Sequence, residues 1–234
     1  MENNSNFKSY LIISPKYFRI CVFHESKKII VYDVKILLEY PQDQIDYIKL
    51  DNFLENNVFK IENELNFLLK DIILVIENDL FFKLQISVKK NHYGKKICIN
   101  DLNYLLNEAK SQTKKSLDGM RVSHMFIENY QIDKNNYNFF PDNYKSNNFS
   151  LDVCFISLPN HIIKDFERVL KKYQIFSTGV ISSDYVYSLY PDYNQNISKF
   201  IDRLQEGISK NEVVLRPKNS RKSGLFEKFF HFFS

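Results

Sequence analysis

The sequence has 234 residues, enough for one large domain or two small ones with a substantial core. Its formal net charge of +4 argues against the broad basic surface of a nucleic-acid-binding protein. Cys21, Cys98 and Cys154 lie far apart without a C-x-x-C pair, so we expect free thiols in a reducing compartment and no structural zinc. No signal-peptide pattern and no run of roughly 18 apolar residues is present. We therefore expect a cytosolic protein whose contact with a membrane is peripheral.

The first ninety residues combine strand patterns with one helix pattern. Short apolar runs predict three strands, at residues 10–13, 18–23 and 29–38. From Asp51 onward apolar residues recur at three- and four-residue steps, which predicts an amphipathic helix of about five turns capped by Asp51 or Asn52. Two further strands are expected, at residues 72–76 and 84–88. Together these elements predict an α/β unit.

A second unit is expected to begin near Lys96. Its first helix is capped by Asn100 or Asp101 and ends before Gly119. Four strands are expected, at residues 122–132, 137–140, 151–158 and 175–181. A helix beginning at Pro159 separates the last two of them. Two further helices are expected, at residues 182–190 and 197–208.

The last eleven residues, 224–234, predict an amphipathic helix. At about 100° per residue the apolar side chains fall within an arc of roughly 160°. This apolar face consists of Leu225, Phe226, Phe229, Phe230, Phe232 and Phe233. A polar, basic stretch precedes the helix, and the cations close to it are Arg221, Lys222 and Lys228. The pattern is typical of a helix that lies in a membrane interface. The alternative is a terminal helix that packs on its own domain.

The order of these elements resembles FtsA, the actin-like bacterial protein that holds the division ring to the membrane. The segments that match the FtsA inserted subdomain are the helix at 99–109, the strand at 126–133, the strand at 151–157, the helix after it, and the strand leading to 181–183. Residues 10–90 look similar to the first part of the actin-like subdomain before that insertion, and the C-terminal helix looks like the FtsA membrane-targeting helix.

The resemblance implies an α+β fold. It comprises a partial actin-like (ribonuclease-H-like) α/β unit, an FtsA-type inserted α+β subdomain, and a C-terminal amphipathic helix on a linker. The divisions expected are 1–92 for the partial actin-like subdomain, 93–190 for the inserted subdomain, 191–210 for a closing helix, 211–223 for the linker and 224–234 for the membrane-targeting helix.

The phosphate-binding features of the actin-like family are missing. Actin-like ATPases begin with a strand and an Asp-Ile-Gly-Thr turn that holds phosphate and magnesium, whereas residues 12–16 read Ile-Ile-Ser-Pro-Lys. None of the five glycines lies in a G-x-G or P-loop pattern. After Ile181 the sequence continues into a helix, the linker and the tail in place of the second phosphate loop and the remaining lobe. We therefore expect no cofactor and no enzyme activity, and FtsZ binding is not carried over.

Two further groups of side chains are candidate sites. The five histidines fall in five different predicted elements without metal-ligand spacing, so no metal site is expected. An aromatic cluster surrounds an expected hairpin loop and either packs beneath it or forms an exposed patch typical of a protein interface. Its members are Tyr137, Phe139, Phe140, Tyr144 and Phe149.

The function that these patterns favour is a non-enzymatic, peripheral-membrane adaptor that resembles FtsA. It would act in bacterial cell division through protein–protein contacts at the cytoplasmic face of the inner (plasma) membrane. The partners expected are the lipid surface and cell-division proteins, with self-association adding avidity, and no nucleic acid. The alternative is a soluble binding or regulatory module, similar to the actin-like component of type IV pilus assembly, whose C-terminal helix packs on its own core. An enzyme whose site is assembled without local motifs is the third hypothesis.

Overall fold

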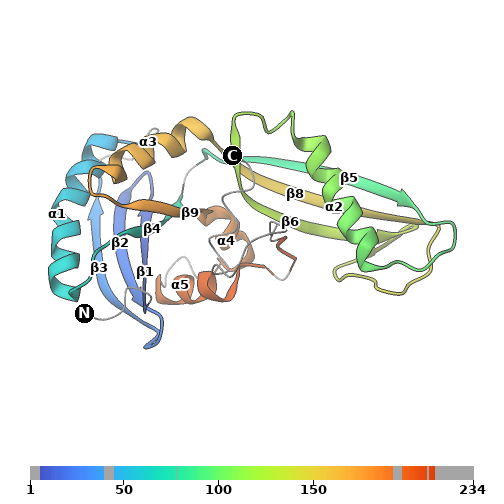
Figure 1. Ribbon diagram of the computed structural model, residues 1–234, viewed down its shortest axis with the longest axis horizontal. Helices are drawn as coiled ribbons and strands as arrows, with labels where there is room; N and C mark the ends of the chain where they lie inside the picture. Colours follow the sequence, from blue (N-terminus) through green and yellow to red (C-terminus); the bar gives the residue numbers. More distant parts are fainter. Residues whose placement is uncertain (1–5, 40–44, 78, 192–196, 210, 214–234) are drawn as a thin grey trace.

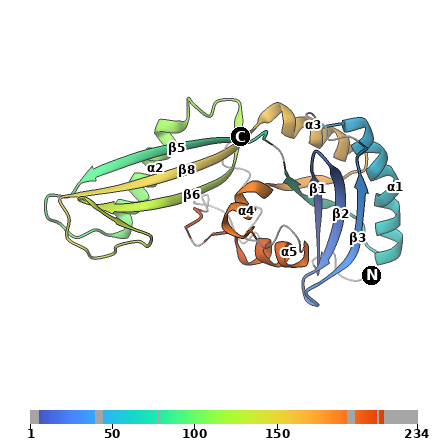
Figure 2. The same cartoon turned by 180° about the vertical axis from the view of Figure 1, so that it is seen from behind.

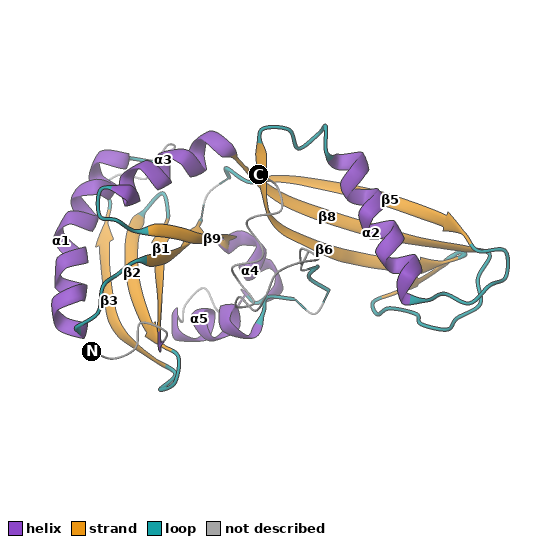
Figure 3. Ribbon diagram, viewed as in Figure 1, coloured by secondary structure: helices purple, strands orange, loops and turns teal. Residues whose placement is uncertain are grey.

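The computed structural model describes residues 6–39, 45–77, 79–191, 197–209 and 211–213. These residues form an elongated, mixed α+β molecule with a sheet at each end (Figures 1 and 3). Helices cover both faces of the first sheet, and one long helix lies along the second sheet.

The first sheet has five strands in the order β3-β2-β1-β4-β9. Its strands are β1 (Phe7–Ile13), β2 (Tyr17–His24), β3 (Ile29–Leu37), β4 (Asp71–Ile76) and β9 (Phe176–Ser182). β1, β2 and β3 form an antiparallel meander, whereas β4 runs parallel to both β1 and β9. The apolar run from Ile72 to Ile76 is buried throughout, as expected for a parallel strand covered on both faces.

Two pairs of helices enclose the first sheet. On one face lie α1 (Tyr47–Leu65) and α3 (Asn160–Lys171), and on the other lie α4 (Ser183–Leu189) and α5 (Ile197–Glu206). Phe166 of α3 is fully buried against the first face, and Phe200 of α5 is buried against the second. Asp51 of α1 accepts hydrogen bonds from Lys172 and Tyr173, which ties α1 to the end of α3.

The second sheet has four antiparallel strands in the order β5-β8-β6-β7. Its strands are β5 (Phe82–Asn91), β6 (Met120–Ile132), β7 (Asn135–Tyr137) and β8 (Asn148–Pro159). Helix α2 (Ile99–Thr113) packs on one face, as the view from behind also shows (Figure 2). The opposite face carries polar pairs, in which Gln85 donates to Glu128 and Ser87 donates to Asp152.

Both helix caps expected from the sequence were wrong. Helix α1 begins one turn earlier than predicted, because Asp46 Oδ1 accepts the N–H groups of Ile48 and Lys49 at 3.1 and 3.0 Å. In α2, Asp101 lies inside the helix and its carboxylate accepts the N–H of Cys98 at 2.9 Å. The sequence offered several acidic or amide residues near each start, and only the local backbone selects among them.

The division of the chain between the two sheets differs from the expected boundaries at residues 92 and 190. β5 pairs with β8 along its whole length, from Phe82↔Ser157 to Asn91↔Asn148. α3 and β9, expected in the inserted subdomain, instead pack in the first sheet. Periodicity identified these elements correctly but carries no information about which strand each one pairs with. The segment from β5 through β8 is therefore the inserted unit of this structure.

Candidate functional site

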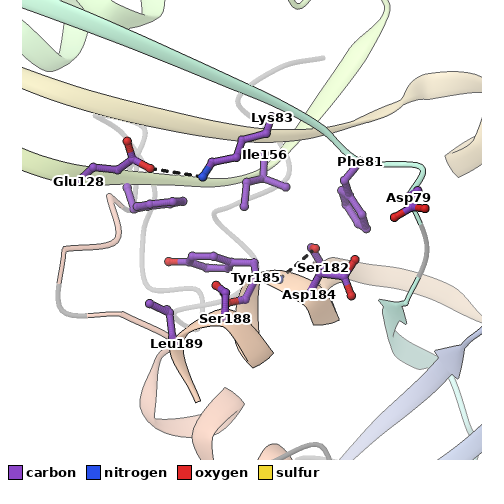
Figure 4. A pocket seen from close by; sticks show the side chains of 11 residues that line it. Asp79, Phe81, Lys83, Glu128, Ile156, Ser182, Asp184, Tyr185, Ser188 and Leu189 are labelled. Atoms are coloured by element: carbon purple, nitrogen blue, oxygen red, sulfur yellow. Dashed lines mark hydrogen bonds and ion pairs between the residues drawn. The ribbon is translucent and has the colours of Figure 1, made fainter. Parts of the chain in front are cut away.

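A pocket of about 470 Å³ lies at the junction of the two units (Figure 4). Phe81 and Lys83 approach it from the connection between β4 and β5 and from β5 itself. The second sheet adds Ile156, and α4 closes the pocket with Tyr185 and Leu189. The pocket is thus formed only when both units are folded and packed together.

The pocket lies where two parallel strands of the first sheet end. Asp79 follows β4, and Ser182 is the last residue of β9. The carboxyl ends of parallel strands are the usual place for ligands in open α/β sheets. Ser183 Oγ donates to the carbonyl of Ile76 at 3.1 Å, which fixes the start of α4 against the end of β4. Ser182 also caps α4, since its side chain accepts the N–H of Tyr185.

The walls of the pocket are mainly apolar. The Tyr185 ring stacks on Phe126 of β6, with centroids 4.8 Å apart and an interplanar angle of 19°. Ile156 of β8 is buried at the same place and belongs to the core cluster that joins α4 and α5 to the first sheet. The Tyr185 hydroxyl is buried at this place. The walls of the pocket therefore offer mainly apolar surface.

The rim carries more negative than positive charge. Lys83 Nζ lies 3.4 Å from a carboxylate oxygen of Glu128. Asp79 and Asp184 form no ion pair within the part of the chain that the structure describes. Burial raises the pKa of Asp184, and the negative charge of Asp79 raises it further. Three carboxylates against one ammonium favour a ligand with basic groups and disfavour a phosphate.

The turn between β1 and β2, where the family resemblance places phosphate binding, is closed by its own hydrogen bonds. Ser14 N–H donates to the carbonyl of Tyr17 at 3.0 Å, and Lys16 N–H donates to Ser14 Oγ at 3.3 Å. Pro15 has no N–H. The Tyr17 hydroxyl donates to Glu77 Oε2 at 2.9 Å, so a tyrosine and a carboxylate stand beside the turn. This arrangement offers no cradle of backbone donors to an anion.

The last described segment, 211–213, runs alongside β6 next to the pocket. Ile127 N–H donates to the carbonyl of Asn211, and Val213 N–H donates to the carbonyl of Met125, at 3.0 and 2.8 Å. These bonds bracket Phe126, which lines the pocket. Of the segment expected as a linker, 211–223, these first three residues therefore continue the second sheet.

A buried histidine ties this segment to both units. His124 Nδ1 lies 3.0 Å from Glu212 Oε1, and His124 Nε2 accepts the N–H of Ser182 at 3.1 Å. Because Nε2 accepts a hydrogen bond, the proton of the neutral ring is on Nδ1, which donates to Glu212. Both side chains are largely buried. The contact holds β6, the end of β9 and residue 212 together.

The aromatic cluster predicted from the sequence assembles at the far end of the second sheet. The Tyr137 ring lies 5.8 Å from Phe139 and 5.7 Å from Tyr144, between ring centroids. Phe139 and Tyr144 are 51% and 44% exposed, so the outer part of the cluster is a surface patch. Phe149 is fully buried and contacts Phe140. Its assignment to a protein interface was wrong, because its position on β8 directs it toward α2.

The other sequence-based site expectations are not tested by these contacts. All nine residues proposed for membrane binding, within 221–233, lie outside the described residues. No helix in the described part of the chain is long and apolar enough to cross a membrane. Among the described residues no three His, Cys, Asp or Glu side chains are grouped to hold a metal ion.

None of the pocket residues was singled out from the sequence. They come from β5, β6, β8 and α4 and from the connection after β4, so no local spacing links them. The one local signal is the pair Ser182 and Ser183 directly after an apolar run, which marks a strand that ends in a helix cap. Such a signal locates a strand end but not a pocket.

Neither the family models nor the curated proteins include a match to this chain. Among solved structures, it is similar to a chain of the PilM–PilN type IV pilus biogenesis complex, with 7% identity and a TM-score of 0.46, over 80% of this chain and 50% of that one. It is also similar to the cytoplasmic domain of EpsL, an inner membrane component of the type II secretion system of Vibrio cholerae, with 9% identity, a TM-score of 0.35 and coverage of 77% and 57%.

A third similar structure is a Bacteroides thetaiotaomicron protein with an actin-like ATPase fold and unknown function, with 10% identity, a TM-score of 0.32 and coverage of 74% and 52%. The chain spans about half the length of these structures. At such identities the likeness concerns the fold alone. The specific resemblance to FtsA stays a prediction, since none of these three descriptions names FtsA.

Proposed function

We propose that this protein is a non-enzymatic adaptor that binds a short apolar and basic segment of a partner protein in the junction pocket. The observation that carries the proposal is the chemistry of that pocket, whose apolar walls are bordered by an excess of carboxylates. Burial of one aromatic or aliphatic ligand side chain contributes about 1.5–3 kcal/mol. A cation placed between Asp79 and Asp184 relieves their mutual repulsion, and an exposed pair of this kind contributes up to about 1 kcal/mol.

The absence of catalysis belongs to the same proposal. Its support is the turn at Ser14 to Lys16, whose backbone donors are engaged within the turn itself. A nucleotide's phosphates are normally held by free backbone N–H groups at such a place. The neighbouring side chains are Tyr17 and Glu77, and the negative charge of Glu77 opposes phosphate binding there. We therefore expect no ATP turnover by the purified chain.

Attachment to a membrane through residues 224–234 completes the proposed adaptor. If each of the six apolar side chains buries half of its surface in lipid, each contributes on the order of 1 kcal/mol. Arg221, Lys222 and Lys228 add about 1 kcal/mol apiece over an anionic leaflet. Ordering a helix of this length opposes binding, because short helices are marginal in water. The result is reversible attachment, at the cytoplasmic face of the bacterial plasma membrane in this proposal.

In this proposal the adaptor works within a membrane-bound protein assembly. The resemblance to FtsA implies that this assembly takes part in cell division. The exposed aromatic pair Phe139 and Tyr144 provides a second contact surface at the far end of the second sheet. In this arrangement the inserted unit presents two surfaces, one at each end. The pocket is the surface whose ligand chemistry can be stated.

The test is the binding of three fluorescent peptides to the full chain, measured by anisotropy. The three peptides have the same length and differ in composition. The first contains aromatic residues and lysines, the second contains aromatic residues and glutamates, and the third contains serines and lysines. We expect only the aromatic, lysine-containing peptide to bind, and Asp79→Asn with Asp184→Asn to weaken it by about threefold to tenfold, since each exposed charge pair is worth up to about 1 kcal/mol. Equal binding of the aromatic glutamate peptide contradicts the proposal. The control is Asp118→Asn with Asp142→Asn, two exposed changes outside the pocket that alter the net charge equally.

A further inference from the structure

We propose that the resting occupant of the junction pocket is the chain's own C-terminal segment, residues 224–234. The pocket and a membrane surface then compete for the same apolar face. This inference rests on the proposed function, because the competition requires that the segment also bind lipid. It adds a specific intramolecular contact that links partner binding to membrane attachment.

The first step is where the segment starts. Val213 is the last described residue, and its N–H is bonded to Met125 beside the pocket residue Phe126. The contact between Glu212 and His124 holds the chain there. Ten residues, 214–223, separate this point from Gly224. Ten residues span at most about 35 Å when fully extended, and a random coil of that length has a root-mean-square span of about 17 Å.

The second step is concentration. Because Val213 adjoins the pocket, the start of a segment ten residues farther along can lie at most about 35 Å from Val213. Short flexible linkers produce effective concentrations in the millimolar range. A contact that would be too weak between separate molecules is therefore well populated within one chain.

The third step is complementarity of surface. The pocket walls include Phe81, Ile156 and Leu189, and the segment presents a face of five phenylalanines and one leucine. A volume of about 470 Å³ lies within the range of natural ligand pockets, roughly 300–1,000 Å³, and accommodates a few aromatic rings. Docking thus covers part of the apolar face that membrane insertion would use.

The fourth step is complementarity of charge. Asp79 and Asp184 border the pocket without an ion pair among the described residues. Lys228 lies within the segment, and Arg221 and Lys222 lie directly before it. Opposite charges on the two sides orient the segment and disfavour competitors that carry carboxylates. Apolar and ionic features of the pocket therefore both match this part of the chain.

The consequence is reciprocal coupling. A docked segment is withheld from lipid, so the apparent membrane affinity equals the intrinsic affinity multiplied by the fraction of molecules whose segment is undocked. A partner that fills the pocket displaces the segment, which can then bind lipid. Conversely, when lipid binds the segment, the pocket becomes empty and available to the partner. Thermodynamic linkage requires both effects to be of equal size.

The direct experiment is disulfide trapping in the full chain. Cys98, the exposed thiol among the described cysteines, is first replaced by serine, and Leu189→Cys is combined with Phe230→Cys. We expect an intrachain disulfide to form under mild oxidation in dilute solution and its yield to fall when anionic phosphatidylglycerol vesicles are added. The matched control pairs Phe230→Cys with Lys60→Cys, an exposed position on α1 across the first sheet. Equal yields for the two pairs, or no disulfide at Leu189, would overturn the proposal.

A second measurement uses charge and leaves the apolar surfaces intact. Asp79→Lys with Asp184→Lys is expected to raise the vesicle affinity of the full chain about threefold to tenfold, because it expels the basic segment from the pocket. Asp118→Lys with Asp142→Lys adds the same charge outside the pocket. We expect this control to raise the vesicle affinity less than the pocket variant does. If the two variants gain equally, the segment does not dock in this pocket.

The two proposals fail in different ways. Suppose that the Leu189→Cys and Phe230→Cys disulfide forms but the chain does not bind vesicles. This result would support docking of the segment and refute the membrane attachment. Vesicle binding without trapping refutes the docking and leaves the adaptor function intact.

Discussion

The two sheets of this protein differ in what covers their faces. The first sheet is enclosed on both sides, by α1 and α3 on one and by α4 and α5 on the other. The second sheet has α2 on one face only. Its other face is apolar near the junction, at Phe126 and Ile156, and polar farther out, at Gln85 and Ser87. The pocket lies where this half-covered face meets the short helix α4.

Because of this difference, we expect the first sheet to matter mainly for folding stability and the open face of the second sheet to matter for ligand binding. A sheet covered on both faces commits its side chains to the core, and a substitution there acts on folding. A sheet with one open face retains surface that a ligand can reach, and that surface here borders the pocket. We therefore expect the cost of substitution to fall from the first sheet, through the junction, to the second sheet.

The largest effect is expected in the first unit. Phe166 of α3 is fully buried between α1 and the sheet. Phe166→Ala removes its apolar contacts and leaves a cavity, which costs about 3–5 kcal/mol in the free energy of unfolding. Urea denaturation followed by circular dichroism measures it. A cost below 1 kcal/mol would mean that the first unit is not the more tightly packed one.

A smaller loss is expected at the junction. Glu212→Ala removes the acceptor of His124 Nδ1 and leaves a buried donor without a partner, a cost of about 1–3 kcal/mol. The same substitution frees residues 211–213 from β6, so amide exchange at Ile127 should become faster. Val213→Ala, one residue along, keeps the hydrogen bonds and is the control. Unchanged exchange in the Glu212 variant would show that this contact does not hold the segment.

The third effect lies in the second unit and depends on pH. Burial alone would raise the pKa of Asp101, but hydrogen bonds from Cys98 and Lys90 outweigh it and lower the pKa to about 2. Because the folded pKa lies below the unfolded value of 3.8, the charged group stabilises the fold above about pH 4, and this contribution disappears as the pH falls through 2.

The corresponding variant is Asp101→Asn. We expect it to cost about 1–2 kcal/mol at neutral pH, reduced from the full linkage value because water screens part of the interaction. The difference from the wild type should shrink between about pH 4 and pH 2. A difference that stays constant over this range would show that the charge of Asp101 contributes nothing.

The sequence predicted the elements well because their signals are local. The apolar run at Ile72 to Ile76 indicated a buried strand, and the alternation at Leu84 to Val88 indicated a half-exposed one; both are confirmed. The partner of each strand depends on contacts far apart in the chain. For that reason β5 was assigned to the wrong unit, and β9 as well.

The site was largely beyond prediction. Phe81, Phe126 and Tyr185 meet in the pocket although more than forty residues separate each from the next. The aromatic cluster was recognised as a group because its members are close in sequence. Their exposure depends on tertiary contacts: Phe149 lies on β8 and is fully buried, whereas Phe139 lies in the loop after β7 and stays at the surface.

The proposal that most needs a test is that this pocket-bearing chain binds lipid through its C-terminal segment. The most direct measurement is sedimentation of the full chain with anionic phosphatidylglycerol vesicles, comparing the wild type with Phe229→Ser plus Phe230→Ser. His231→Ser, on the polar side of the predicted helix, is the control. We expect the wild type and the control to sediment and the double variant to stay in solution. Sedimentation of the double variant to the same extent as the wild type would contradict it.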